Sequence, residues 1–140
     1  MNAKFLISSK MLLSTLAALL LLPLAANAES VTMTGKMNGL NCVLTGYVCP
    51  VDKKDPIKAL ETDFVLQTPD GKFYYLTNLS RDVKASYFLD SIEVSGELNS
   101  KYDAIQVDAL KVRQGDAYKT VWSQKMHQEA LKELFGPPGH

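Results

Sequence analysis

The stretch that decides the fold reads Phe64-Val-Leu-Gln-Thr-Pro-Asp-Gly-Lys-Phe-Tyr-Tyr-Leu-Thr77. Residues 64–68 and 73–77 show the two-residue alternation and the aromatic content that are typical of strands. Between them, Pro69 presets the backbone of a tight turn, and Gly71 accepts the left-handed conformation that closes the loop. The stretch therefore predicts an antiparallel hairpin. Large side chains lie on both of its faces, so we expect one face to be core and the other to be either covered or a binding surface.

A short helix and two further strands are predicted after the hairpin. Ser80 is a suitable helix cap, and the apolar residues that follow share one face, which predicts a helix from residue 80 to about residue 89. Residues 91–98 and 105–112 then alternate between apolar and polar side chains, as half-buried strands do. A change of phase within the second of these strands predicts a bulge near Asp108.

A first strand is predicted before the hairpin, over residues 31–37. Gly35 lies in its middle on the apolar phase, where a glycine lets a strand coil sharply and serve both sides of a closed barrel. Residues 38–54 contain several turn residues and are expected to form a loop. Asp55 is then expected to cap one or two helical turns that lead into the hairpin.

The N-terminal residues 1–28 are predicted to be a cleaved signal peptide. Two lysines precede an apolar run over residues 11–22, which is too short for a membrane span with normal flanks. Ala26-Asn27-Ala28 is a small-x-small cleavage signal, so the mature chain is expected to begin at Glu29 and to be periplasmic or secreted. A retained signal anchor is the alternative, and the cleavage signal argues against it. No stable membrane insertion is expected after cleavage.

The mature chain is expected to form one domain over residues 29–116, followed by a C-terminal helical extension over residues 117–140. Ser123 to Phe135 is the predicted helix of this extension, and it is expected to pack on the barrel or, alternatively, to dock to a partner. Loss of two lysines with the leader takes the formal net charge from 0 to −2. This balance argues against nucleic acid as a partner. No residue pattern predicts an oligomeric state.

The predicted order of elements resembles the OB-fold, a five-stranded barrel with a helix between its third and fourth strands. The residues that carry this resemblance are Gly35, the hairpin of residues 64–77, Ile92-Glu-Val-Ser-Gly-Glu-Leu98 and Ile105-Gln-Val107. The chain is most similar to small exported bacterial OB-fold domains. The resemblance implies an all-β fold with short helices, a five-stranded barrel with a helix between strands three and four. The loop with the two cysteines and the predicted C-terminal helix are departures from this pattern. It also implies a binding module, since OB-folds bind oligonucleotides, sugars, metals or proteins, mostly on the second and third strands.

The two cysteines, Cys42 and Cys49, are predicted to form a disulfide. An even number of cysteines in an exported chain favours this pairing, which would stabilise the fold by about 2–3 kcal/mol in the entropic model. Two alternatives remain: a redox pair, although its spacing is wider than C-x-x-C, and a thiolate metal site. In the metal site Met126 and His127 would be the further soft ligands.

The candidate contact residues for a ligand or partner are Lys72, Tyr74, Tyr75, Tyr102 and Trp122. Aromatic rings on an OB surface stack on bases or sugars, whereas the alternative for these rings is core packing and cross-strand pairing. No motif for general acid–base, nucleophilic or phosphate chemistry is present, so neither an enzyme nor a cofactor is expected. The sequence thus predicts an exported, non-enzymatic OB-fold binding module for a protein or a small polar ligand. A metal-binding or thiol-redox protein that uses the two cysteines is the alternative.

Overall fold

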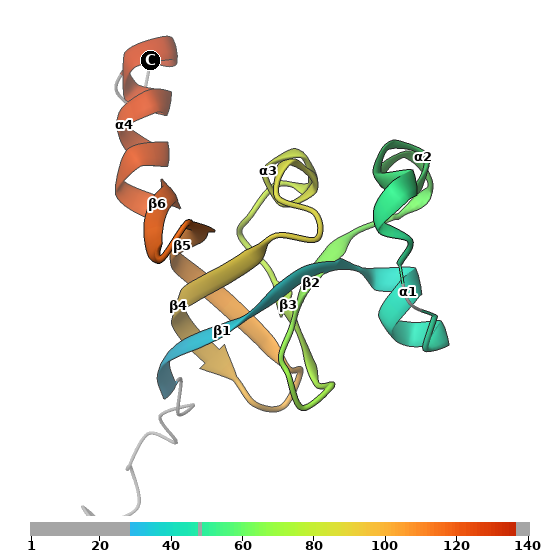
Figure 1. The fold of residues 1–140 in the computed structure, drawn as a ribbon. Helices are drawn as coiled ribbons and strands as arrows, with labels where there is room; N and C mark the ends of the chain where they lie inside the picture. The colour runs from blue at the N-terminus through green and yellow to red at the C-terminus, as the bar shows by residue number, and fades with distance from the viewer. Residues whose placement is uncertain (1–28, 48, 137–140) are drawn as a thin grey trace, which may run out of the picture.

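A closed five-stranded barrel forms the centre of the described chain, which covers residues 29–47 and 49–136 of this computed structural model (Figure 1). The strands are β1 (Glu29–Gly39), β2 (Phe64–Gln67), β3 (Phe73–Leu76), β4 (Ser91–Asn99) and β5 (Ala104–Gln114). β1 pairs with β2 and β4, β3 pairs with β2, and β5 closes the ring by pairing with β4 and, in parallel, with β3. The predicted OB-fold-like barrel is confirmed. The predicted signal peptide, residues 1–28, lies outside the described residues.

Short helices and one additional strand surround the barrel in the described part of the chain. The connection from β1 to β2 holds α1 (Leu40–Thr45), a 3-10 turn η1 (Val51–Lys53) and α2 (Lys54–Leu60). α3 (Arg81–Ser86) lies between β3 and β4, and β6 (Ala117–Ser123) and α4 (Gln124–Phe135) end the described chain. The predicted helix between the third and fourth strands and the predicted C-terminal helix are therefore both present.

The hairpin, the helix cap and the bulge agree with the sequence in detail. β2 and β3 are antiparallel, and Gly71 in their turn has φ +86°. Ser80 caps α3, because its hydroxyl accepts a hydrogen bond from the Val83 backbone. Between β4 and β5, Ser95 pairs with Ala109 and Gly96 pairs with Val107, which leaves Asp108 as the extra residue of the bulge. Local turn and phase signals are sufficient for these features.

Three expectations about local structure are wrong. Residues 38–54 are not a continuous loop, because α1 and η1 form within them. Asp55 lies inside α2 and does not cap it, since the N-cap position is Lys53. α3 is shorter than predicted, because turns follow Ser86 and Leu89 has a positive φ of 68°. A carboxylate 20 residues away caps α1, η1 runs directly into α2 so that this helix begins before Asp55, and α3 ends in the turns that lead into β4.

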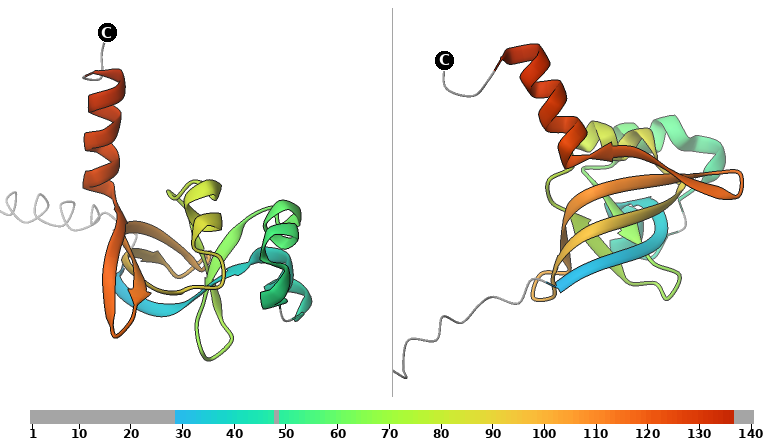
Figure 2. Two further views of the ribbon diagram at one scale, coloured as in Figure 1. Left: turned by 45° about the horizontal axis from the view of Figure 1, so that its top comes forward. Right: turned by 90° about the vertical axis from the view of Figure 1, so that its left-hand side faces the viewer.

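The C-terminal segment also differs from its expected form. β6 was not predicted, and it adds to the edge of β5 as a largely exposed strand. α4 follows β6 without a connecting loop and extends away from the barrel, with none of its described side chains buried (Figure 2). The expectation that this helix packs on the barrel is therefore wrong. None of the helices among the described residues is long and apolar enough to cross a membrane.

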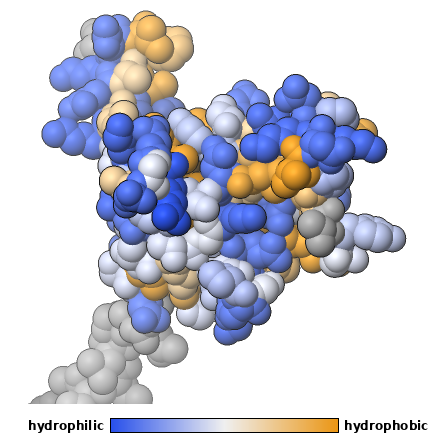
Figure 3. All heavy atoms as spheres, viewed as in Figure 1, coloured by the Kyte–Doolittle hydropathy of each residue, from blue (hydrophilic) through white to orange (hydrophobic). Residues whose placement is uncertain are grey.

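The core fills the barrel with the inward side chains of all five strands. The largest fully buried side chains include Phe64, Leu66, Ile92 and Ile105, and Phe88 after α3 packs on Phe64 with ring centroids 5.3 Å apart. Exposed apolar side chains gather instead on α4 and on the connection between β1 and β2 (Figure 3). Both cysteines lie in this connection between β1 and β2.

Candidate functional site

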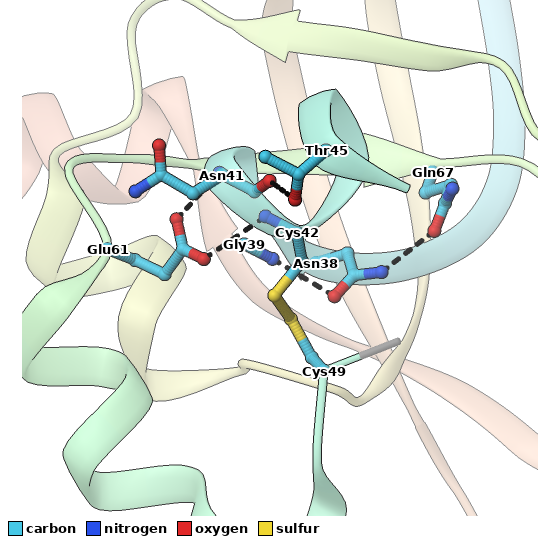
Figure 4. The surroundings of a disulfide bond; sticks show 8 residues. All are labelled: Asn38, Gly39, Asn41, Cys42, Thr45, Cys49, Glu61 and Gln67. Atoms are coloured by element: carbon cyan, nitrogen blue, oxygen red, sulfur yellow. Dashed lines mark hydrogen bonds between the residues drawn. A yellow bond between two sulfur atoms is a disulfide. The ribbon is translucent and has the colours of Figure 1, made fainter. Parts of the chain in front are cut away.

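The predicted disulfide joins Cys42 of α1 to Cys49 in the following loop, with the two Cα atoms 5.8 Å apart (Figure 4). Cys49 is buried in the core cluster and Cys42 is partly buried against it. The cross-link closes a loop with a sequence separation of 7, which is worth about 2.5 kcal/mol in the entropic model. The disulfide therefore attaches the loop around Tyr47 to the end of the barrel.

Glu61, just before β2, is the buried carboxylate beside this disulfide. Its Oε2 accepts a 2.8 Å hydrogen bond from the Asn41 backbone, and its Oε1 accepts a 3.3 Å bond from the Cys42 backbone. These are N–H groups of the first turn of α1, which otherwise has no side-chain cap. Gly39 makes room for the carboxylate, because a Cβ there would lie 2.4 Å from Oε1. Glu61 thus holds α1 in place of a local capping residue.

Sequence reasoning missed Glu61, and no local signal would have found it. The bond to Asn41 spans 20 residues, so the cap comes from a different part of the chain. Gly39 alone does not give it away, since glycine is also an ordinary residue at a helix N-cap.

Two adjoining hollows run along the outward face of β1, and we call them together the β1 groove. The first has a volume of about 360 Å³ and lies between β1, the β2–β3 turn, Ser91 and Tyr118. The second has a volume of about 300 Å³ and lies between β1, Leu89 and the loop that joins Cys42 to Cys49, which we call the cysteine loop. Lys36 and Gln67 line both hollows, so they form the junction of the groove.

The β1 groove is lined mainly by groups that form hydrogen bonds. Thr34, Lys36 and Asn38 point outward from alternate positions of β1, as the two-residue period of a strand requires. The Asn38 amide donates a 2.7 Å hydrogen bond to the Gln67 side-chain oxygen and so fixes the orientation of both amides. Tyr118 borders one hollow, and Tyr47, which is 77% exposed, borders the other. The arrangement offers polar donors and acceptors between two aromatic rings.

Among the predicted contact residues, those of the hairpin face different ways. Tyr74 is partly buried and packs against the core, on the inward face of β3. Tyr75 lies on the opposite face and packs edge-on against Phe73, with centroids 5.8 Å apart. Lys72 is exposed and lines, with Tyr74, a third hollow of about 350 Å³. The two tyrosines therefore do not form one surface.

The remaining predicted contact residues lie elsewhere. Tyr102 is 61% exposed on the turn between β4 and β5 and lines a separate hollow of about 420 Å³. Trp122 on β6 is buried, and its ring lies 6.0 Å from that of His127. None of the five predicted residues lines the β1 groove in the described structure.

The alternative set of metal ligands is not assembled. Met126 and His127 belong to α4, whereas Cys42 and Cys49 lie at α1, on the opposite side of the barrel in both Figure 1 and Figure 2. The acidic group beside the two sulfurs is Glu61, whose carboxylate oxygen lies within 4.8 Å of both Sγ atoms. The sequence thus identified two members of a possible donor set but assigned the wrong neighbours to them.

The turn between β2 and β3 contains a carboxylate with a shifted pKa. The Thr68 hydroxyl donates a 2.5 Å hydrogen bond to Asp70 and lowers the pKa of that carboxyl below its ordinary value, with smaller contributions from Lys72. Because Asp70 is fully exposed, this geometry is that of a stabilised turn.

No protein-family model, curated protein or solved structure matches this chain. Function is therefore inferred from the residues of the β1 groove and the cysteine loop.

Proposed function

We propose that this protein is an exported, non-enzymatic binding module that holds a small polar ligand, or a polar segment of a protein, in the β1 groove. The observation that carries the proposal is the junction at Lys36 and Gln67, where two hollows of about 360 and 300 Å³ adjoin. Ligand pockets typically have volumes of about 300–1,000 Å³ and contain a few oriented polar groups. The β1 groove meets both conditions.

The lining of the groove supports a particular class of ligand. Its described side chains include hydroxyls, two amides that are already oriented by their mutual hydrogen bond, and the ammonium group of Lys36, but no carboxylate. Such a lining favours a neutral or anionic ligand that carries several hydrogen-bonding groups. The tyrosines at the two ends suit a flat or ring-shaped group, since aromatic faces stack on sugars and similar rings.

The disulfide supports the exported location, because disulfides persist in oxidising compartments such as the periplasm. It also contributes to the groove directly, since both cysteines line the second hollow. The cysteine loop is then a wall of the site, as well as a means of stabilising the fold.

The test is a thermal-shift screen of sugars, amino acids and small carboxylates, followed by calorimetric titration of any ligand found. Lys36→Ala and Gln67→Ala are expected to weaken its binding by about tenfold or more, because each removes a hydrogen-bonding group at the junction. Lys125→Ala is the matched control, since this lysine on α4 is 85% exposed and remote from the groove. A ligand that all three variants bind as tightly as the wild type would place the site elsewhere and overturn the proposal.

A further inference from the structure

We propose that the reduced protein binds a zinc-type divalent cation through Cys42, Cys49 and Glu61. This site is distinct in chemistry from the ligand proposed for the β1 groove, and it exists when the disulfide is open. One ligand atom from each of the three residues lies within 4.8 Å of the others. Thiolate and carboxylate are both established zinc ligands, and a catalytic-type site keeps three protein ligands and one position for water.

The distances are close to those that a tetrahedral site needs. Zinc–sulfur bonds of about 2.3 Å and zinc–oxygen bonds of about 2.0 Å place neighbouring ligand atoms roughly 3.5–3.8 Å apart. The Cα atoms of Cys42 and Cys49 are 5.8 Å apart, so rotation of the side chains suffices to separate the two sulfurs. A small closing movement of Glu61 then completes the set, because its carboxylate is already within the limit of 4.8 Å.

The charge of Glu61 is a second, independent indication of a cation. Its carboxylate is buried and forms no ion pair with any described residue. Arg81 lies close but donates to the backbone carbonyl of Glu61, with its Nη2 at 3.0 Å from that oxygen. A buried carboxylate without a cation is costly, and two backbone N–H groups offset only part of that cost. A divalent cation between Glu61 and two thiolates would supply the missing positive charge.

The site also stays partly formed when the disulfide opens, and it has an entry path. Cys49 is only 3% exposed and remains packed in the core, while Glu61 is held by the N–H groups of α1. The hollow of about 300 Å³ borders both cysteines and is open to solvent. It offers the ion a route from solvent to the two sulfurs.

The redox step balances with a dithiol as reductant. The dithiol breaks the bond between Cys42 and Cys49, becomes a disulfide itself and leaves two protein thiols. The cation then replaces the two thiol protons, forms two metal–sulfur bonds and one metal–oxygen bond, and releases two protons to solvent. Because the same sulfurs are used, the disulfide and the cation exclude each other.

The first test uses the full exported chain, reduced with a dithiol that is then removed without oxygen. Titration with Co²⁺ should give one ion per chain, with the intense thiolate-to-cobalt absorption of a tetrahedral site, and Zn²⁺ should displace it. The oxidised protein should bind no cobalt in this way. If the reduced protein shows no such absorption, the proposal is wrong.

The second test asks whether Glu61 is a ligand. Glu61→Gln should weaken zinc binding on the order of 10- to 100-fold, whereas the matched change Glu97→Gln, at an exposed position of β4, should leave it unaltered. Equal affinity in the wild type and Glu61→Gln would overturn the assignment. Since Glu61 also holds α1, Glu61→Cys provides a readout that does not depend on affinity. X-ray absorption should count two sulfurs on zinc in the wild type and three in Glu61→Cys, and an unchanged count of two would exclude position 61.

Discussion

Replacement of Gly35 by alanine should destabilise the barrel more than any other single added methyl group in the β1–β2 seam. β1 pairs with β4 as far as Lys36 and with β2 from Lys36 onward, so Gly35 lies at the changeover. A Cβ at this position would lie 2.2 Å from the Gln67 carbonyl oxygen and 2.8 Å from Cδ1 of Leu66. The Leu66 side chain can rotate, but the Gln67 oxygen belongs to the backbone of the neighbouring strand and can move only if the seam opens.

The magnitude follows from this contact. Added methyl groups that overpack a core lower the free energy of unfolding by about 1–3 kcal/mol. Because the Gln67 backbone oxygen cannot move aside, we expect Gly35→Ala to cost about 3 kcal/mol, at the upper end of this range. For a domain of this size that corresponds to a fall in Tm of roughly 12 °C. Gly71→Ala is the matched control: the space around it is open, but its φ of +86° makes a side chain strained. Left-handed strain alone should cost about 1 kcal/mol.

The assay is urea unfolding followed by fluorescence of Trp122, the single tryptophan, with thermal unfolding by circular dichroism as a second probe. Gly35→Ala should be less stable than Gly71→Ala by about 2 kcal/mol. If the two variants lose equal stability, the cost at Gly35 is conformational rather than steric, and the argument from the close approach fails.

Three further results are expected. Asp63→Asn should destabilise the protein by about 2–3 kcal/mol, because it leaves the buried Lys84 ammonium without a counter-charge. In the folded protein this ammonium lies 2.5 Å from the Asp63 carboxylate. Lys84→Met should lower the free energy of unfolding by less in the same assay. Folding lowers the pKa of Asp70, so its carboxylate stabilises the hairpin fully at any pH above the pKa of about 3.9 that it has in the unfolded chain. This stabilisation is lost as the pH falls through the lower pKa of the folded protein. Thr68→Val should raise that pKa toward its ordinary value in an NMR titration. Truncation after Ser123 should leave Tm almost unchanged, because α4 has no buried side chain, and a large fall would show that α4 stabilises the barrel.

The barrel was predictable because its signals are local. The hairpin, the Ser80 cap and the bulge at Asp108 each depend on a few consecutive residues, and their order resembles a known topology. β6 was missed because it is an edge strand with mostly exposed side chains, so its alternation carries little hydrophobic contrast. α1 was missed because its capping group, Glu61, comes from another part of the chain.

The candidate site was harder to predict because its residues come from distant parts of the chain. Tyr74 and Tyr75 are adjacent in sequence, so the pleat of β3 points one side chain inward and the other outward. Their shared aromatic character therefore did not make them parts of one binding surface. The β1 groove depends on Lys36 and Gln67 meeting across two strands, and on Tyr118 from a strand that was not expected. To predict a surface formed by several strands, one must know the register in which neighbouring strands pair, and the sequence of a single strand does not contain this register.

The segment from Glu61 to Asp63 explains how the fold and the cysteine loop are connected. Directly before β2, the Glu61 carboxylate holds α1, and the Asp63 carboxylate pairs with Lys84 of α3. The Asp63 carbonyl also accepts a 3.0 Å hydrogen bond from the Leu40 backbone, which fastens the start of α1 to the barrel. Glu61 and Asp63 thus tie α1 and α3 to the hairpin that organises the fold. Opening the disulfide should therefore leave both α1 and the buried Cys49 in place, and this is the condition under which the sulfurs and Glu61 can close on a cation.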